Sequence, residues 1–450
     1  MKLSTVAVLG VALGVAYTLS PLAVLCLASL AALVRWAASD LQGRERDWFL
    51  IVFVTAIVTR VVIIGGLLLI ADDTKPYAVL FGDEWIFKSR PIWLRNVGLG
   101  IPISTADFIY AYDETGMSGH MYVLGLLQAL VGDAPYGMHL FSVTIYCGAM
   151  IAMYRVVRSS FGAGIALGGT AVLLFLPSLF FWSISVLKEP VYIAVAMLEL
   201  LMVLAIVRGQ GWARRAAAVV AVIVLAFTME ELRRGTVLVA ALGAGVGLAT
   251  WWILQAYWRV AAALILVPSA IVVAFMQEPV QARALNLVHQ SVKLHAGHIV
   301  TAGVSYPLVE PRIYQNWALI PQIDGREGAR YVARAVLAYF VEPLPDKMQS
   351  RLLWSYLPEH FTWLLLMVLA PIGVAGAMRR DPALASLLLA HAASIVMMVA
   401  LASGNIGTLV RHRGLSLPYL VWFSVLGAAM VMSRLQAAGT SRAHLESAGE

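Results

Sequence analysis

The sequence predicts an all-α protein, a polytopic bundle of about 11–12 transmembrane helices. Of its 450 residues, 61% are hydrophobic and only 13% are charged, and the mean hydropathy is +0.82. Soluble domains do not have this composition. Ten apolar runs have roughly the length of a helix that crosses a bilayer. Arginines fall at every second junction between these runs, as the positive-inside rule requires.

The ten runs are the expected spans of the main domain, which covers residues 48–433. They lie at residues 48–71, 136–155, 161–180, 189–207, 213–230, 235–254, 259–276, 358–378, 382–402 and 414–433.

The arginines predict the orientation of these spans. Arg35, Arg44 and Arg46 precede the first run. The later junctions contain Arg155, Arg158, Arg208, Arg214, Arg215, Arg259, Arg379, Arg380 and Arg434. With these junctions in the cytoplasm all ten spans alternate, and the loops 72–118 and 277–357 face outward. We therefore expect an integral membrane protein with its two long loops on the outer side. The net charge of +7 reflects loop arginines and not nucleic-acid binding.

Three segments differ from regular spans. Residues 1–34 form an extra N-terminal membrane segment, which Ser20-Pro21 divides into either one long interrupted span or a hairpin of two short ones. The run from His120 to Val131 is too short to cross, so we expect a helix at the outer interface. The first outer loop is then partly helical, and the second forms a small cap of short helices. Residues 434–450 are polar and are predicted to be a disordered cytoplasmic tail.

An acidic pair, Asp83-Glu84, stands in the first predicted outer loop, after a span that ends near Ile70. A carboxylate beside the membrane can act as the general base on an acceptor hydroxyl. The alternative is that both carboxylates are simply solvated.

Basic groups occur on the same predicted side. Lys188-Glu189 lies at a tight turn, where the lysine either reaches lipid phosphate in the headgroup layer or faces the bundle and binds a phosphate. Arg411, His412 and Arg413 lie in a short outer loop, where arginine is disfavoured, so they require an anionic partner such as a substrate phosphate or a lipid headgroup.

Other polar residues carry weaker signals. Charged side chains inside spans usually face the bundle interior, and here these are Arg60 and Glu199. A further charged cluster, which pairs internally in the simplest interpretation, consists of Glu230, Glu231, Arg233 and Arg234. Three histidines match no strong metal-ligand spacing and are expected in a solvated loop: His289, His295 and His298.

The order of these motifs resembles a known family over roughly residues 48–433. The motifs are Arg60, Asp83-Glu84, Gly119-His120, Leu176-Pro177 through Ser183, Leu187-Lys188-Glu189-Pro190 and Arg411-His412-Arg413. In this order they resemble the polytopic C-type glycosyltransferases that use polyprenyl-phosphate sugars, such as protein mannosyltransferases and aminoarabinose transferases. The chain is particularly similar to bacterial exopolysaccharide-type members.

The resemblance implies roles for single residues. Asp83 matches the catalytic base, with Glu84 as its neighbouring carboxylate. His120 matches the family's histidine before the interfacial helix, although Met121 and Tyr122 follow it in place of two prolines. The resemblance implies a substrate- and phosphate-binding set of Lys188, Glu189, Arg411, Arg413, His120 and His412. Members of the family often work without a metal, and no ligand cluster here is convincing, so dependence on a divalent metal stays an open alternative without support in the sequence.

The expected activity is transfer of a sugar, with inversion, from a lipid-linked donor to an acceptor hydroxyl on the outer face. The acceptor is a glycan, a lipid or a protein, and the other expected partners are membrane lipids. One alternative is an O-antigen or exopolysaccharide polymerase or ligase, which depends on basic residues more than on a carboxylate. A lipid-linked sugar transporter or flippase is a second alternative, but the internal repeat typical of transporters is missing.

Overall fold

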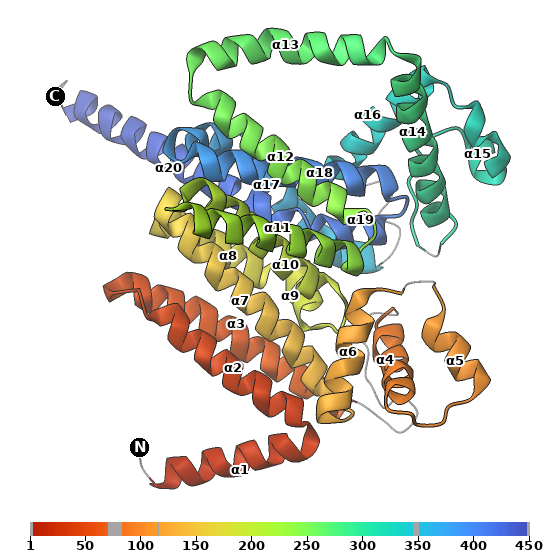
Figure 1. The fold of residues 1–450 in the computed structure, drawn as a ribbon. Coiled ribbons are helices and arrows are strands. Elements are labelled where there is room, and N and C mark those ends of the chain that lie inside the picture. Colours follow the sequence, from red (N-terminus) through yellow and green to blue (C-terminus); the bar gives the residue numbers. More distant parts are fainter. Residues whose placement is uncertain (1–2, 71–82, 115–116, 302, 345–350, 448–450) are drawn as a thin grey trace. The chain divides into compact units, whose positions relative to one another are not determined.

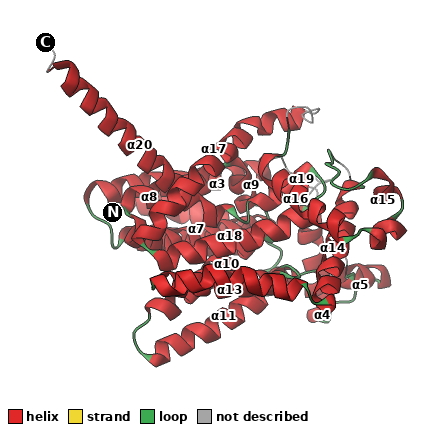
Figure 2. Cartoon of the chain, turned by 90° about the horizontal axis from the view of Figure 1, so that it is seen from above, coloured by secondary structure: helices red, strands yellow, loops and turns green. Residues whose placement is uncertain are grey.

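The computed structural model describes residues 3–70, 83–114, 117–301, 303–344 and 351–447. These residues form 21 helices, and 86% of the structure is helical. Figure 2 shows helices and loops but no strand across this described part of the chain. The all-α prediction is therefore confirmed.

The chain forms two compact units, Met1–Val237 and Leu238–Glu450. Figure 1 follows the helices in chain order. The first unit contains α1 (Leu3–Leu19), α2 (Pro21–Ala38), α3 (Gly43–Leu69), α4 (Glu84–Gly98), α5 (Thr105–Tyr112), α6 (Gly119–Val131), α7 (Pro135–Phe161), α8 (Ala163–Phe175), α9 (Pro177–Ile184), α10 (Glu189–Arg208) and α11 (Trp212–Leu232). The second contains nearly all of α12 (Thr236–Leu254), then α13 (Tyr257–Phe275), α14 (Glu278–Ile299), α15 (Pro311–Gln315), η1 (Trp317–Gln322), α16 (Gly325–Val341), α17 (Arg351–Arg380), α18 (Pro382–Ala402), α19 (Ile406–Arg413) and α20 (Leu417–Ser447).

Nine helices in the described residues are long and apolar enough to cross a membrane, and the chain is an integral membrane protein. They are α2, α3, α7, α10, α12, α13, α17, α18 and α20. A tenth span results if α8 and α9 are counted together. The sequence predicted about 11–12 spans. The difference lies in α1, which is a shorter apolar helix, and in α11, which forms over the predicted 213–230 span but is not among the nine.

The predicted span 161–180 is broken. Helix α8 ends at Phe175, α9 begins at Pro177, and the two axes differ by 64°. Proline disfavours helical backbone in the residue before it, and Leu176 accordingly has an extended ψ of 124°. The second helix therefore starts in a new direction and places the turn that follows it inside the first unit.

Helix α7 forms the centre of the first unit. It packs against α2, α3, α8, α9 and α10. Its inward side chains are almost fully buried: Met138, Val143, Tyr146, Cys147, Met150 and Tyr154. Functional side chains on neighbouring helices are thus positioned against one rigid element.

The first predicted outer loop is partly helical, as the sequence predicted. Part of the first predicted outer loop forms α4 and α5, and α6 is the predicted short apolar helix. Residues 71–82 and 115–116 of that region lie outside the described residues. The second predicted loop contains two short helices, α15 and η1, and two longer ones, α14 and α16, which have 22 and 17 residues. Helix α20 runs from Leu417 to Ser447. The predicted disorder of the tail stays a prediction.

The second unit contains a very close helix pair, α17 with α20. A Cβ at Gly373 would lie 1.7 Å from the Phe423 carbonyl oxygen, and one at Gly427 would lie 2.1 Å from the Leu369 carbonyl oxygen. Small residues of this kind let two membrane helices approach backbone to backbone.

We expect Gly373→Ala to destabilise this unit, because the added methyl group can only be accommodated by separating α17 from α20. Overpacking of this kind costs about 1–3 kcal/mol. Thermal unfolding of the detergent-solubilised protein measures the change. The matched control is Gly245→Ala in α12, where a Cβ would meet nothing within 4 Å. Equal unfolding temperatures for the two variants would contradict the predicted contact.

Candidate functional site

The candidate site is built around residues 183–188, which are the last two residues of α9 and the connection to α10, and which we together call the turn. Ser183, Ile184, Ser185, Val186 and Leu187 are each at most 1% exposed. Pro190, the second residue of α10, has no amide hydrogen to donate and favours a helix start at this point. Buried peptide groups need hydrogen-bond partners, and side chains from α4, α6 and α7 supply several of them.

Glu84 and His120 bind the two polar groups of Val186. Glu84 Oε1 accepts a hydrogen bond from the Val186 amide at 2.7 Å. His120 Nε2 donates to the Val186 carbonyl at 3.0 Å, which requires the proton on that nitrogen. Both side chains are fully buried. The sequence places these residues 36 positions apart, and the turn brings them together.

His139 and Arg60 hold the preceding part of the turn. His139 Nδ1 donates to the Ile184 carbonyl at 2.5 Å and lies 3.6 Å from Glu84 Oε1. Arg60 Nε donates to Ser183 Oγ at 2.8 Å, while its Nη2 donates to the Leu174 carbonyl at 2.7 Å. Arg60 therefore fits the structural interpretation of a buried charge, in which it ties one helix to its neighbours.

Lys88 lies one helical turn after Glu84 and is 1% exposed. Burial lowers the pKa of Lys88, and the negative charge of Glu84 opposes that shift. Two residues of α4 thus form a buried pair of opposite charge at the turn. Burial also lowers the pKa of His120 to about 4, against the effect of its hydrogen bond to Val186. His120 is therefore neutral at physiological pH.

A cavity of about 690 Å³ adjoins the end of the turn, within the usual size range of ligand sites. Its charged lining residues are Lys188, Glu114, Glu230, Glu231, Arg233 and Arg234. Glu230 is engaged within the fold, because its two carboxylate oxygens accept from the amides of Gly235 and Val237 at 2.8 and 3.0 Å, at the start of α12. These partners are backbone amides, so pairing among the charged side chains of the cluster stays a prediction. The cations at this cavity are Lys188, Arg233 and Arg234.

The two carboxylates of the predicted catalytic pair lie in different surroundings. Asp83 is exposed and precedes α4 as its N-terminal cap residue, without a capping hydrogen bond from its side chain. Glu84 is fully buried and bonded to the turn. Glu189 is 3% exposed at the first position of α10. Solvent therefore reaches the Asp83 carboxylate, whereas the Glu84 carboxylate holds the buried turn in place.

The second unit contains the remaining predicted residues, on α19. Arg413 is 2% exposed. Its Nε donates to the Tyr339 carbonyl at 2.8 Å, and its guanidinium lies 5.0 Å from the ring centre of Trp363. Arg413 thus binds the last turn of α16. Lys188 and Arg411 belong to different units, so a phosphate site that combines them stays a prediction.

The three histidines predicted as a solvated loop instead lie on α14. His289, His295 and His298 each bond a backbone carbonyl, of Ile323, Ser403 and Ala402, at 2.6 to 2.9 Å. These bonds attach α14 to η1 and to the end of α18. Among the described residues, no group of three or more His, Cys, Asp or Glu side chains could hold a metal ion.

Sequence reasoning missed Lys88 and His139. Lys88 follows Glu84 at the i+4 spacing that favours an acid–base pair on a helix. His139 is an ionisable residue inside an apolar run, which by itself signals a functional or structural role. Both signals were present, but neither indicates the partner that each residue finds in the turn.

We expect Glu84→Gln to destabilise the protein by about 3 kcal/mol, because it leaves the buried Lys88 charge without its neighbouring carboxylate. Lys88→Met should cost a similar amount. The double variant should lose less than the sum of the two, with a coupling energy of about 1–3 kcal/mol. Unfolding in detergent measures all three. Glu114→Gln, at an exposed carboxylate, is the control, and additive losses would argue against a direct pair.

Acid should destabilise the protein through His120. Its pKa is about 4 in the folded state against about 6.5 unfolded, so the unfolded state binds more protons between these values. The contribution of neutral His120 to the free energy of unfolding is fully present above pH 6.5 and is lost as the pH falls towards 4. From pH 7.5 to pH 5 the contribution lost is about 2 kcal/mol. His120→Gln, which can still donate to Val186, should show a correspondingly weaker dependence of unfolding on pH. An unchanged pH dependence would contradict this role.

The comparisons with known proteins found no counterpart: no family model, curated protein or solved structure matches the chain.

Proposed function

We propose that the protein is a membrane glycosyltransferase that moves a sugar from a polyprenyl-phosphate donor to an acceptor hydroxyl. One observation carries the proposal. Arg60, Glu84 and His120, which the resemblance connects only by their order in the chain, all bond the turn that ends at Lys188. Lys188 then lines a charged cavity. A motif order that reflects one site should converge in this way.

The proposal gives the two carboxylates different roles. Asp83 is the base, because it is exposed and can meet an acceptor hydroxyl. Glu84 is a positioning residue, since its Oε1 accepts from the Val186 amide inside the protein. This division refines the expectation that either member of the pair could take the proton.

The cations at the cavity suit the leaving group. Lys188, Arg233 and Arg234 can bind the phosphate oxygens of the donor and stabilise the charge that develops there. The acceptor oxygen forms a bond to the anomeric carbon, and the bond from that carbon to the phosphate oxygen breaks. The acceptor proton passes to Asp83, and polyprenyl phosphate leaves with the electron pair. A single displacement inverts the anomeric centre.

The proposed location is the cytoplasmic membrane of a bacterium, with the active site on the outer face. The alternation of loop arginines supports this orientation. A lipid-linked donor would reach the site from the bilayer. The acceptor is a glycan, a lipid or a protein.

We expect Asp83→Asn to slow sugar transfer by roughly 10²–10⁴-fold, which is the usual contribution of a general base. The protein should still insert and unfold normally, because the side chain is exposed. Transfer from a radiolabelled polyprenyl-phosphate sugar to membrane acceptors measures the rate. The control is Asp47→Asn, another exposed aspartate of the same unit.

Transfer at the original rate by Asp83→Asn would overturn the proposed mechanism. A polymerase or ligase should also tolerate this change, because it depends on basic residues. Transbilayer movement of the donor lipid in vesicles without any transfer would instead indicate a flippase.

A further inference from the structure

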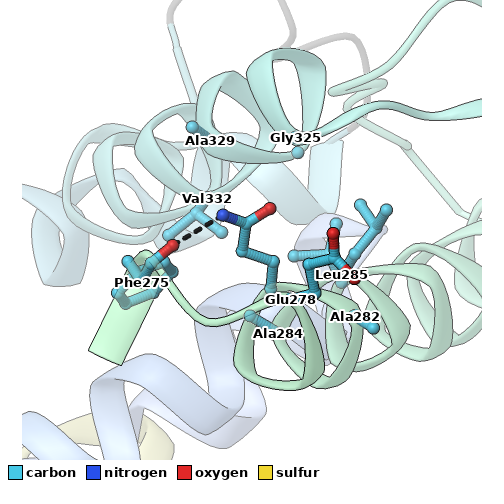
Figure 3. A pocket seen from close by; sticks show the side chains of 11 residues that line it. Phe275, Glu278, Ala282, Ala284, Leu285, Gly325, Ala329 and Val332 are labelled. Carbon is cyan, nitrogen blue, oxygen red and sulfur yellow. Dashed lines mark hydrogen bonds between the residues drawn. The ribbon is translucent and has the colours of Figure 1, made fainter. Parts of the chain in front are cut away.

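An apolar groove lies in the second unit between α14 and α16, with Phe275 at the end of α13 as part of its wall (Figure 3). Its volume is about 760 Å³, which is large enough for a ligand of the size that protein pockets usually bind. Alanine, glycine, leucine and valine make up most of the remaining wall. Such a surface suits a hydrocarbon and offers little to a polar molecule.

The groove is hollow because small residues line the part where the two helices diverge. A Cβ at Gly325 would meet nothing within 4 Å, whereas one at Gly328 would lie 3.3 Å from Val288. The helices therefore touch near Gly328 and leave open space near Gly325. Ala282 and Ala329 face this space from the two helices and are exposed.

The groove adjoins α13 at one end. Helix α13 is a candidate span, and none of its described side chains is buried inside the protein. Lipid is therefore the natural surrounding of α13 along its length. Phe275 is 54% exposed and is both the last residue of α13 and a wall of the groove. The α13 end of the groove therefore lies beside a helix whose side chains are not covered by the described protein.

The charge at the groove favours one class of lipid. Glu278 carries the single charge among the residues that line it. The neighbouring polar side chain, Gln281, donates to the Phe275 carbonyl at 2.6 Å and so stays at the junction of α13 and α14 (Figure 3). A carboxylate attracts an ammonium group and repels a lipid whose headgroup is only anionic.

We propose that this groove binds one acyl chain of a bilayer phospholipid with an amine headgroup, phosphatidylethanolamine, whose ammonium group pairs with Glu278. The bound acyl chain contacts both α14 and α16. It fills the part of the groove in which the two helices do not touch each other. The assignment is independent of the proposed transfer reaction, because it uses none of the residues of that site.

The test uses the full chain in nanodiscs that contain phosphatidylethanolamine with a diazirine in one acyl chain. After illumination, peptide mass spectrometry should find adducts on the groove-lining segments of α14 and α16. Ala282→Phe and Ala329→Phe fill the groove and should lower these adducts by roughly tenfold, the change that follows from a loss of about 1.4 kcal/mol. Asn286→Phe adds the same ring at an exposed position of α14 outside the groove and should leave them unchanged.

The headgroup is tested with phosphatidylglycerol carrying the same diazirine. It should label the groove roughly threefold less, as expected for the loss of one exposed ion pair, and Glu278→Gln should remove this difference. Equal labelling of the Ala282→Phe and Asn286→Phe variants would mean that only surrounding lipid reacts, and would overturn the site. Equal labelling by the two lipids in the unmodified protein would overturn the amine assignment.

Discussion

The Val186 peptide has both of its polar groups bonded by side chains from other helices. Glu84 accepts from the Val186 amide and His120 donates to the Val186 carbonyl, so neither group needs a water molecule as its partner. A turn this deeply buried would otherwise leave peptide groups unpaired at a cost of a few kcal/mol each. These two bonds hold the turn in place between α9, which begins at Pro177, and α10, whose start Pro190 favours.

The same constraint separates the roles of adjacent carboxylates. Glu84 is drawn into the protein by a peptide amide and by the opposite charge of Lys88. Asp83, one residue earlier, remains exposed at the helix start. A buried carboxylate that already accepts a hydrogen bond cannot easily receive a substrate proton, whereas an exposed one can. In the proposed enzyme the acidic pair therefore combines a structural and a chemical function.

Much of the fold could be predicted from the sequence, because hydropathy and arginine placement act over whole helices. The break at Leu176 was missed although Pro177 was visible, since an apolar run of the right length is interpreted as one span. Within the site, Glu84 and His120 were found through motif order. His139 was not, because a lone histidine in an apolar run does not reveal a carbonyl partner 45 residues away. The contact of Arg413 with Tyr339 likewise depends on packing that no local pattern encodes.

The break between α8 and α9 also changes how a charge can exist inside the bundle. Ending α8 leaves backbone carbonyls near the break without the helical partners they would have in a continuous helix. Two of these carbonyls, of Leu173 and Leu174, accept from Tyr146 Oη at 2.6 Å and from Arg60 Nη2 at 2.7 Å. The helix break thus leaves carbonyl groups that can accept hydrogen bonds from the buried Arg60 guanidinium. In turn, Arg60 donates to a carbonyl that has lost its helical partner. Removing either one alone would leave buried polar groups of the other without these partners.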